Sequence, residues 1–169
     1  MPCHMSPDTP APKAPFWVKP FLLLSSTRMG GRWLARYTPH IDHLFANLSG
    51  GRFTLAGLAV PMLLLTTTGR RSGQARCTPV MYLPWEGHYA LLASNGGQPS
   101  HPAWFLNLQD TPACQISVDG RQYDVQAIVT QGEQRKALWQ VFITFNPGFA
   151  RYQQRLTRQI PIVLLKTTT

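Results

Sequence analysis

The pattern of apolar and polar positions after residue 58 predicts a series of short strands. Residues 59–68 (AVPMLLLTTT) form an apolar run that ends in β-branched threonines, residues 75–83 (ARCTPVMYL) form a second run, and residues 88–94 (HYALLAS) a third. Short apolar runs bounded by turn residues are typical of β-strands. We therefore predict three consecutive strands, joined by turns at residues 69–74 and 85–87.

The rest of the pattern mixes helices with further strands. An Asp-Gly pair at Asp119 and Gly120 separates two alternating runs, residues 113–118 and 121–129, which is the strongest short hairpin signal in the chain. Helical spacing of apolar residues and a final apolar run predict the remaining elements: helices at 101–109, 131–144 and 147–156, and a strand at 160–165. This order indicates an α+β fold with a barrel-like, mainly antiparallel sheet of about six strands.

The first part of the chain has a different composition. Residues 1–14 are rich in proline and small polar residues, which is typical of a disordered tail, and residues 15–37 are apolar, aromatic and basic together. Thr38 and Pro39 fit the start of a helix that Gly50 and Gly51 would end. We therefore predict a tail at 1–14, an apolar and basic N-terminal segment at 15–37, and a barrel domain at 38–169.

Residues 15–36 allow two interpretations. Aromatic and basic residues mixed in this way can lie in a membrane interface, although the apolar run at 21–24 is far shorter than the ~20 residues that span a bilayer. The alternative is a segment that packs on the domain or at a dimer contact. The sequence leaves both open, and with them a homodimer and a peripheral position on the inner face of the cell membrane.

The charge balance favours anionic partners. Lys and Arg outnumber Asp and Glu by 16 to 7, which gives a formal net charge of +9. Such a field attracts phosphate groups, nucleic acid or anionic headgroups, or simply keeps the protein soluble. No helix-turn-helix pattern or aromatic-basic sheet motif accompanies the charge, so we do not predict a nucleic-acid partner.

Cysteine and histidine positions give no sign of a metal or disulfide framework. The three cysteines have no CxxC spacing, and the pair His40 and His43 has no carboxylate-rich segment beside it. The first residues also lack the apolar core of a secretory signal. We expect a reduced, cytoplasmic protein without a bound metal.

The turn at 66–74 (TTTGRRSGQ) is the most informative segment. Gly69 and Gly73 allow positive φ and would turn backbone N–H groups inward, which makes a small anion-binding nest. Arg70 and Arg71 add charged donors suited to phosphate or carboxylate, and Arg76 follows on the next strand. The alternative is an ordinary exposed turn with solvated arginines.

Two further stretches are candidates for contact with a ligand or substrate. Gly96 and Gly97 would let the backbone approach a flat ring that Ser94 could bond, and Trp104 would form a wall or simply part of the core. Asn146, Phe149 and Tyr152 are three apart, so they share one face once helical. On that face Tyr152 would donate a proton to a substrate that has accepted a hydride, unless the face serves only for packing.

Taken together, these stretches resemble the deazaflavin-dependent nitroreductase family, also called the F-420-dependent quinone reductases. The resemblance runs from about residue 61 to 165 and rests on ordered motifs: LLLTTTGRRSGQAR, ASNGGQPSHPAW followed by LNL, NPGFARYQ, and the closing IPIVLL. It implies a split β-barrel like that of flavin-mononucleotide-binding oxidoreductases, and hydride transfer from a reduced deazaflavin to quinones, nitroaromatics or activated enones. In such proteins the coenzyme carries the reaction and the protein supplies orientation.

The resemblance also implies roles for individual residues. The turn and the basic residue after it would hold the phosphate and anionic tail: Thr68, Gly69, Arg70, Arg71, Ser72, Gly73 and Arg76. The second strand and the glycine loop would line the ring: Pro79, Val80, Met81, Ser94, Asn95, Gly96, Gly97 and Trp104. Tyr152 and Ser94 are the catalytic candidates.

This chain departs from the family pattern at three positions. The family's last helical segment often reads Tyr-Pro-x-Tyr-x-x-Tyr, whereas Asn146 and Phe149 replace the first two tyrosines here. Asn95 stands where a lysine often follows the serine of the glycine loop. The alternatives are therefore a flavin-mononucleotide-dependent oxidoreductase on the same fold, or a non-catalytic cofactor- or lipid-binding protein at the membrane surface. The acceptor stays open.

Overall fold

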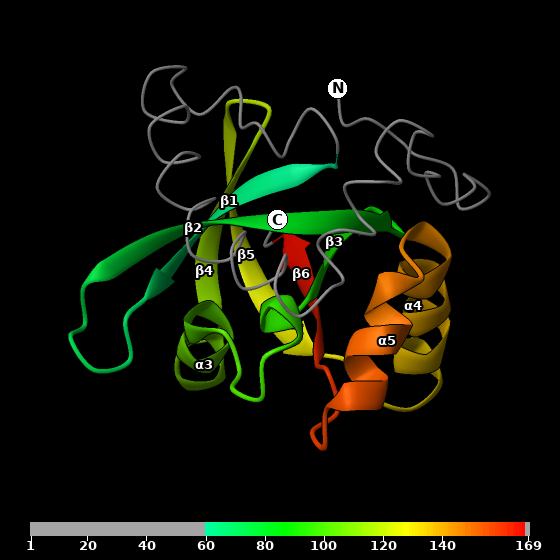
Figure 1. Ribbon diagram of the computed structural model, residues 1–169. Helices are drawn as coiled ribbons and strands as arrows, with labels where there is room; N and C mark the ends of the chain where they lie inside the picture. Colours follow the sequence, from blue (N-terminus) through cyan, green and yellow to red (C-terminus); the bar gives the residue numbers. More distant parts are fainter. Residues whose placement is uncertain (1–59, 168–169) are drawn as a thin grey trace.

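The computed structural model describes residues 60–167, and this part of the chain folds around a six-stranded barrel (Figure 1). Short turns connect most elements, so neighbours in sequence are also neighbours in space. The elements in chain order are β1 (Met62–Thr68), β2 (Ala75–Trp85), β3 (His88–Leu92), the 3₁₀ turn η2 (Asn95–Gly97), α3 (Ala103–Asp110), β4 (Ala113–Val118), β5 (Arg121–Val129), α4 (Gly132–Phe145), α5 (Gly148–Arg155) and β6 (Ile162–Thr167).

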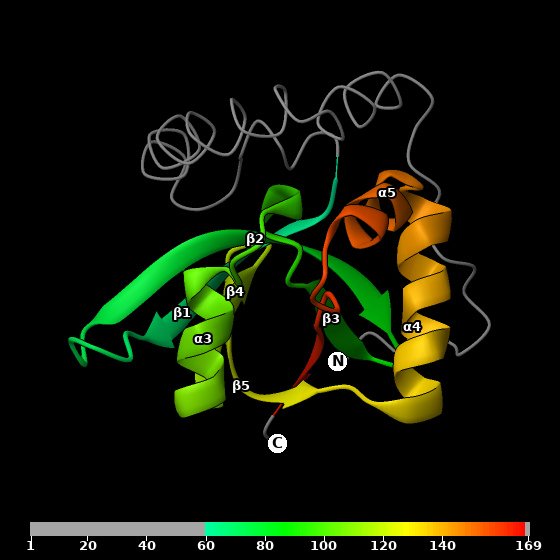
Figure 2. The ribbon, with the colours of Figure 1, turned by 60° about the horizontal axis from the view of Figure 1, so that its bottom comes forward.

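The sheet closes on itself in the order β1-β2-β3-β6-β5-β4, and each neighbouring pair is antiparallel. Helix α3 lies against one side of the barrel, while α4 and α5 lie on the other (Figure 2). Closure leaves no free sheet edge, which removes the main route to strand-mediated aggregation. The predicted α+β class with a split β-barrel of about six antiparallel strands and flanking helices is confirmed.

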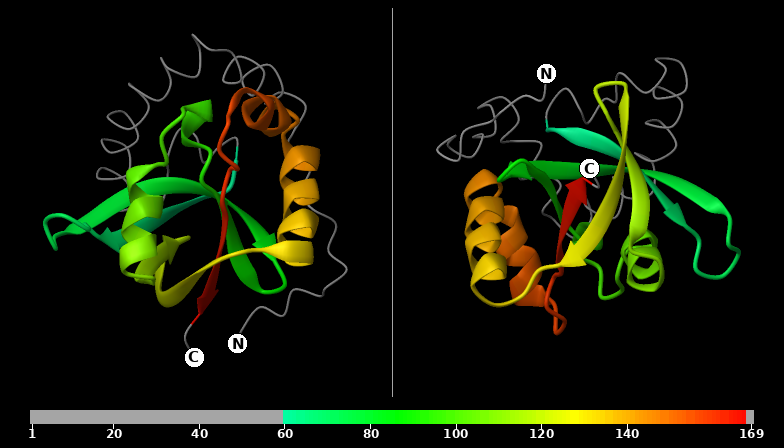
Figure 3. Two further views of the ribbon diagram at one scale, coloured as in Figure 1. Left: turned by 90° about the horizontal axis from the view of Figure 1, so that it is seen from below. Right: turned by 180° about the vertical axis from the view of Figure 1, so that it is seen from behind.

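Two apolar clusters hold the fold together, and strands β2, β3 and β6 lie between them. Val80 and Tyr82 pack into the barrel interior with α3, whereas Met81 and Leu83 face the cluster under α4 and α5. Alternate residues of a strand point to opposite faces, so a single strand serves both clusters. Figure 3 shows α4 and α5 beside β3 and β6, on the side of the barrel away from α3.

Most predicted elements lie within two or three residues of their predicted bounds. The hairpin at 113–118 and 121–129 is confirmed, with Asp119 and Gly120 both at positive φ, as their turn requires. The third strand ends at Leu92 rather than residue 94, because the Ser94 N–H turns back to the Leu92 carbonyl at 2.9 Å.

The last strand begins at Ile162 rather than residue 160. Pro161 immediately precedes it and has no N–H to donate to a ladder. Beyond the predicted end at residue 165, pairing with β5 continues through Lys166 and Thr167.

Several predictions lie outside the described residues. They concern the tail at 1–14, the apolar and basic segment at 15–37, the helix after Thr38, and the histidine pair His40 and His43. The proposed domain boundaries therefore stay predictions.

Candidate functional site

The arginine turn, residues 69–74, joins β1 to β2 at the far end of a long hairpin (Figure 1). Its backbone is tightly bonded: the Gly69 N–H donates to Gln74 O at 2.8 Å and the Gly73 N–H to Gly69 O at 2.7 Å. Arg70, Arg71 and Arg76 are all exposed. The structure thus places Arg70 and Arg71 in one ordered turn and Arg76 at the adjoining start of β2.

The two glycines of this turn have different roles. Gly73 has a φ of +67°, as predicted, whereas Gly69 is not among the glycines at positive φ. At Gly69 a Cβ would lie only 2.9 Å from the Ser72 Oγ and 3.1 Å from the Gln74 carbonyl. Gly69 is therefore required for space rather than for a left-handed backbone, which corrects half of the prediction.

Asn107 of α3 fixes the arginine turn from behind. Its Oδ1 accepts from the Arg70 backbone N–H at 3.1 Å, and its Nδ2 donates to the Thr67 Oγ1 at 3.0 Å. Asn107 is only 7% exposed, and Thr67 is 2% exposed. Because buried polar groups are costly unless bonded, this pair holds turn and helix in one arrangement. The LNL motif contains Asn107, but nothing in the sequence assigned it this contact.

A groove of about 460 Å³ lies beside the turn, between β1 and the β4–β5 hairpin. Its lining includes Thr68, Gly73 and Asp124, but none of the three arginines. Burial also raises the pKa of the Cys114 thiol in this groove to about 11, so that side chain is neutral. The charges therefore favour the arginine side of the turn, not the groove, for an anion.

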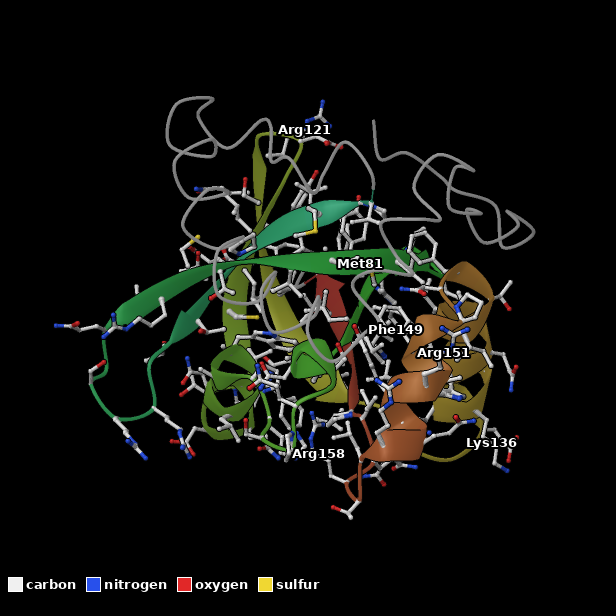
Figure 4. All side chains as sticks on the ribbon, viewed as in Figure 1. Met81, Arg121, Lys136, Phe149, Arg151 and Arg158 are labelled. Atoms are coloured by element: carbon white, nitrogen blue, oxygen red, sulfur yellow. The ribbon has the colours of Figure 1, made fainter. Side chains whose placement is uncertain are left out.

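The predicted ring-lining residues of β2 do not share a face. Val80 is buried in the barrel interior, while Met81 packs against the cluster that contains Phe149 and Tyr152. Figure 4 shows Met81 and Phe149 on the same side of the molecule. Pro79 alternates with Val80 and so belongs to the face of Met81. One ligand can touch Pro79 and Met81 directly, but not Val80 from the same side.

Trp104 lies in the core. It is 8% exposed and contacts Phe105 edge to face, with ring centroids 6.2 Å apart. This agrees with the packing interpretation, and a direct contact with a ligand stays a prediction.

The glycine loop and Tyr152 meet at close range. Gly97 has a φ of +75°, and a Cβ at this position would lie 2.7 Å from the Tyr152 Cδ1. The aromatic ring that approaches the Gly97 backbone is therefore that of Tyr152, which is 7% exposed. The structure thus brings the two catalytic candidates, Ser94 and Tyr152, to one loop and the helix packed against it.

Asn146 and Phe149 have structural roles in α5. The Asn146 Oδ1 accepts from the Gly148 N–H at 2.9 Å, which bonds the first turn of the helix. Phe149 packs between Phe142 and Tyr152, with ring centroids 6.1 and 6.2 Å away. Both positions where the family often has tyrosine are therefore taken up by helix capping and packing.

No pattern in the sequence indicates the role of Arg158. This residue follows α5, and its guanidinium group donates to the loop at residues 93–101, here called the site loop (Figure 4). The acceptors are five backbone carbonyls and one ring nitrogen: Pro99 O at 2.9 Å, Ser94 O and Gln98 O at 3.0 Å, Ser100 O at 3.1 Å, Ala93 O at 3.4 Å and His101 Nδ1 at 3.3 Å.

Residues 60–167 contain neither a candidate membrane-spanning helix nor a candidate metal site. No helix in that range is long and apolar enough to cross a bilayer. The same range contains no cluster of three or more histidine, cysteine or carboxylate side chains placed to hold a metal ion.

Comparisons with known proteins agree on one family. The sequence model described as F420H(2)-dependent quinone reductase matches residues 41–167. An F420H(2)-dependent quinone reductase of Mycobacterium tuberculosis is 36% identical over 110 residues, which cover 63% of this chain and 74% of that protein.

Two solved structures are also similar to this chain. A structure titled F420-H2 dependent reductase is 34% identical with a TM-score of 0.58, and the match covers 63% of this chain and 94% of that one. Another, titled as a domain-swapped dimer, is 32% identical with a TM-score of 0.59, covering 74% and 95%.

Proposed function

This chain belongs to the F420H(2)-dependent quinone reductase family, and we propose that it transfers a hydride from the reduced deazaflavin coenzyme F420 to a quinone. One observation carries the proposal beyond family membership. Two exposed arginines, Arg70 and Arg71, lie in an ordered turn that the buried Asn107 holds in place, and a third, Arg76, lies at the adjoining start of β2. This arrangement suits a ligand with a phosphate and further negative charges, as F420 has.

The arginine turn binds the anionic end of the coenzyme in this proposal. Arg70 and Arg71 are free to turn toward a ligand, because their side chains make no hydrogen bond to a described residue. Arg76 lies over Gly69, with its Cγ 3.5 Å from where a Cβ would be. Thr68 and Ser72 add hydroxyl groups, whereas the Gly69 and Gly73 N–H groups already donate within the turn, so these two glycines shape the site rather than bond the ligand.

The site loop and the outer face of β2 position the ring. Pro79 and Met81 offer an apolar surface, while Ser94, Asn95, Gly96 and Gly97 offer backbone and hydroxyl groups. Val80 and Trp104 support these residues from the barrel interior, where both are buried. Burial of the ring against this surface excludes water from the reacting atoms.

Ser94 and Tyr152 are the proposed sources of a proton. The bound coenzyme supplies the hydride, and the reduced quinone oxygen then needs one proton to become a neutral hydroquinone. The Tyr152 ring packs on the site loop at Gly97, and its phenol is the proton-donor candidate on α5. A positioned proton donor contributes roughly 10²- to 10⁴-fold to such a step.

The acceptor range and the location of the protein are part of the same proposal. We propose a quinone as the hydride acceptor, as the description of the family and the name of the relative from Mycobacterium tuberculosis indicate. Quinones dissolve in membranes, and this agrees with a cytoplasmic protein that residues 15–36 hold at the inner membrane surface. The domain-swapped relative supports a homodimer.

Titration with F420 tests the proposal. Tryptophan fluorescence of the purified protein is expected to change on addition of F420, with Arg71→Ala weakening the binding about tenfold. Absorbance of the reduced coenzyme is expected to fall when a quinone is added. Binding of flavin mononucleotide but not F420 would contradict the proposed coenzyme. Binding of F420 without turnover of a quinone would contradict the proposed enzymatic activity.

Tyr152→Phe separates the proton donor from the binding site. The variant keeps the ring that packs on Gly97 and removes only the hydroxyl, so F420 affinity should stay the same. Turnover of the quinone should fall by roughly 10²-fold or more. An unchanged rate would assign the proton to Ser94 or to water, which Ser94→Ala then tests.

A further inference from the structure

Arg158 is bound almost entirely by backbone. Its guanidinium group donates to five carbonyl oxygens of the site loop at distances of 2.9 to 3.4 Å. It forms no ion pair with a described carboxylate. A guanidinium group has five N–H donors in a rigid fork, so a single side chain can fix several carbonyls at once.

Two of these carbonyls also have a donor within the site loop: the Ser94 carbonyl accepts from the Gly97 N–H at 3.1 Å and the Ser100 carbonyl from the Asn95 Nδ2 at 3.0 Å. The site loop contains only the short turn η2, so most of its carbonyls lack the regular bonds of a helix or sheet. Buried or half-buried carbonyls need a donor, and Arg158 provides it from the segment that follows α5. Gln153 of α5 adds to this link: its Nε2 donates to the Arg158 carbonyl at 2.9 Å, and its Oε1 accepts from the Ile160 N–H at 2.8 Å.

Fixing the carbonyls also orients the N–H groups of the loop. In a trans peptide the C=O and N–H point in opposite directions, so the Asn95 N–H points away from the Ser94 carbonyl that faces Arg158. The Gly96 N–H likewise points away from the Asn95 carbonyl, which accepts from Gln98 N–H at 3.1 Å. Neither N–H donates to a residue within 60–167.

The backbone conformation at Ser94 and Asn95 is one that binds a hydrogen-bond acceptor. Ser94 is right-handed helical, with φ −72° and ψ −29°, and Asn95 follows at a φ of +52°. A right-handed residue followed by a left-handed one turns successive N–H groups toward one concave point. Such a point binds an anion or a carbonyl oxygen.

We propose that Arg158 is a positioning residue for the coenzyme. Its guanidinium group holds the carbonyls of the site loop on one side and thereby presents the Asn95 and Gly96 N–H groups to an oxygen of the coenzyme's ring system. Arg158 does not touch the coenzyme. This inference rests on the proposed function only for the identity of that ring, because the hydrogen bonds belong to the protein alone.

Substitution of Arg158 by Met or Lys tests the proposal. Arg158→Met removes every donor, and Arg158→Lys keeps the charge but cannot span five carbonyls. Arg121→Met is the matched control, since Arg121 is exposed at the tip of the β4–β5 hairpin (Figure 4) and loses the same charge. Circular dichroism and thermal melting check that each variant folds.

Two measurements are made on each variant in the full-length protein. Hydrogen exchange of the amides at residues 94–101 should speed up about tenfold or more in Arg158→Met, less in Arg158→Lys, and not in the control. The dissociation constant for F420 should rise about tenfold in Arg158→Met, and KM for F420 should rise far more than kcat falls.

Unchanged exchange in a folded Arg158→Met protein would overturn the positioning role. Faster exchange with an affinity within twofold of the parent would overturn the link to the coenzyme. If the parent protein does not bind F420 at all, the proposed function fails, while the exchange measurement still decides whether Arg158 orders the loop. If Arg158→Met does not fold, Arg158→Lys carries both measurements.

Discussion

Arginine side chains have opposite roles at the arginine turn and at the site loop. At the turn and the adjoining start of β2, Arg70, Arg71 and Arg76 are exposed, and the amide of Asn107 orders the backbone of the turn. At the loop, Arg158 itself orders the backbone through five carbonyls and has little capacity left for a ligand. The role of an arginine in this protein therefore depends on which hydrogen-bond acceptors the fold places around it, not on its charge.

Removal of both turn arginines should give the largest effect. In Arg70→Ala/Arg71→Ala the F420 dissociation constant should rise roughly 30- to 100-fold, because two charge-assisted contacts are lost. The melting temperature should stay close to that of the parent, since neither side chain bonds to a described residue. Fluorescence titration and melting measure the two quantities, with Arg121→Ala as the control. A large fall in melting temperature would show that the turn arginines stabilise the fold, as Arg158 does, and would contradict their role as ligand-binding residues.

Gly97→Ala should destabilise the protein by about 2–3 kcal/mol, because it adds both strain and overlap. The φ of +75° disfavours a side chain, and the Cβ would lie 2.7 Å from the Tyr152 ring. Gly73→Ala is the matched control: its φ is +67°, but no heavy atom lies within 4 Å of a Cβ. Denaturant unfolding should show a cost of only about 1–2 kcal/mol there. Equal costs would show that the Tyr152 contact contributes nothing.

Asn107→Ala should affect both stability and affinity, unlike either arginine. Loss of the amide leaves the Thr67 hydroxyl and the Arg70 N–H with one partner fewer, at a cost of about 1–3 kcal/mol in unfolding free energy. The loosened turn should also bind F420 a few-fold more weakly. Thr67→Val is the control, because it removes the hydroxyl and keeps the Asn107 bond to the Arg70 N–H. An F420 affinity in Asn107→Ala equal to that of the parent would show that the turn binds the coenzyme whether or not Asn107 orders it.

His101 should give the smallest effect, a pH dependence confined to the site loop. Burial, and secondarily the nearby Arg158, lower the pKa of His101 below its usual 6.5. The folded state therefore favours the neutral ring, so its contribution to stability is complete above pH 6.5 and is lost as pH falls through the lowered pKa. Unfolding at several pH values should show this loss in the parent but not in His101→Gln. Identical profiles of stability against pH in the parent and the variant would show that His101 does not contribute to this pH dependence.

Local chemistry in the sequence determined most of the fold. The Asp119-Gly120 pair marks its hairpin because few other residues adopt positive φ at both turn positions. Strand alternation also places Val80 and Met81 on opposite faces of β2, so of these two only Met81 lies on the face of Phe149 and Tyr152, and contact of either with a ring stays a prediction. Three arginines within seven residues are likewise bound to lie near each other on a tight hairpin.

Contacts between distant residues were decided only by the tertiary structure. Asn107 lies 37 residues from Arg70, and Arg158 lies 57 to 65 residues from its partners in the site loop. Neither spacing follows a helical or strand period, so no local pattern reports it. Barrel closure and the packing of α3 and α5 bring these polar groups together. Whether an arginine binds a ligand or the protein's own backbone depends on that closure, which the sequence does not display.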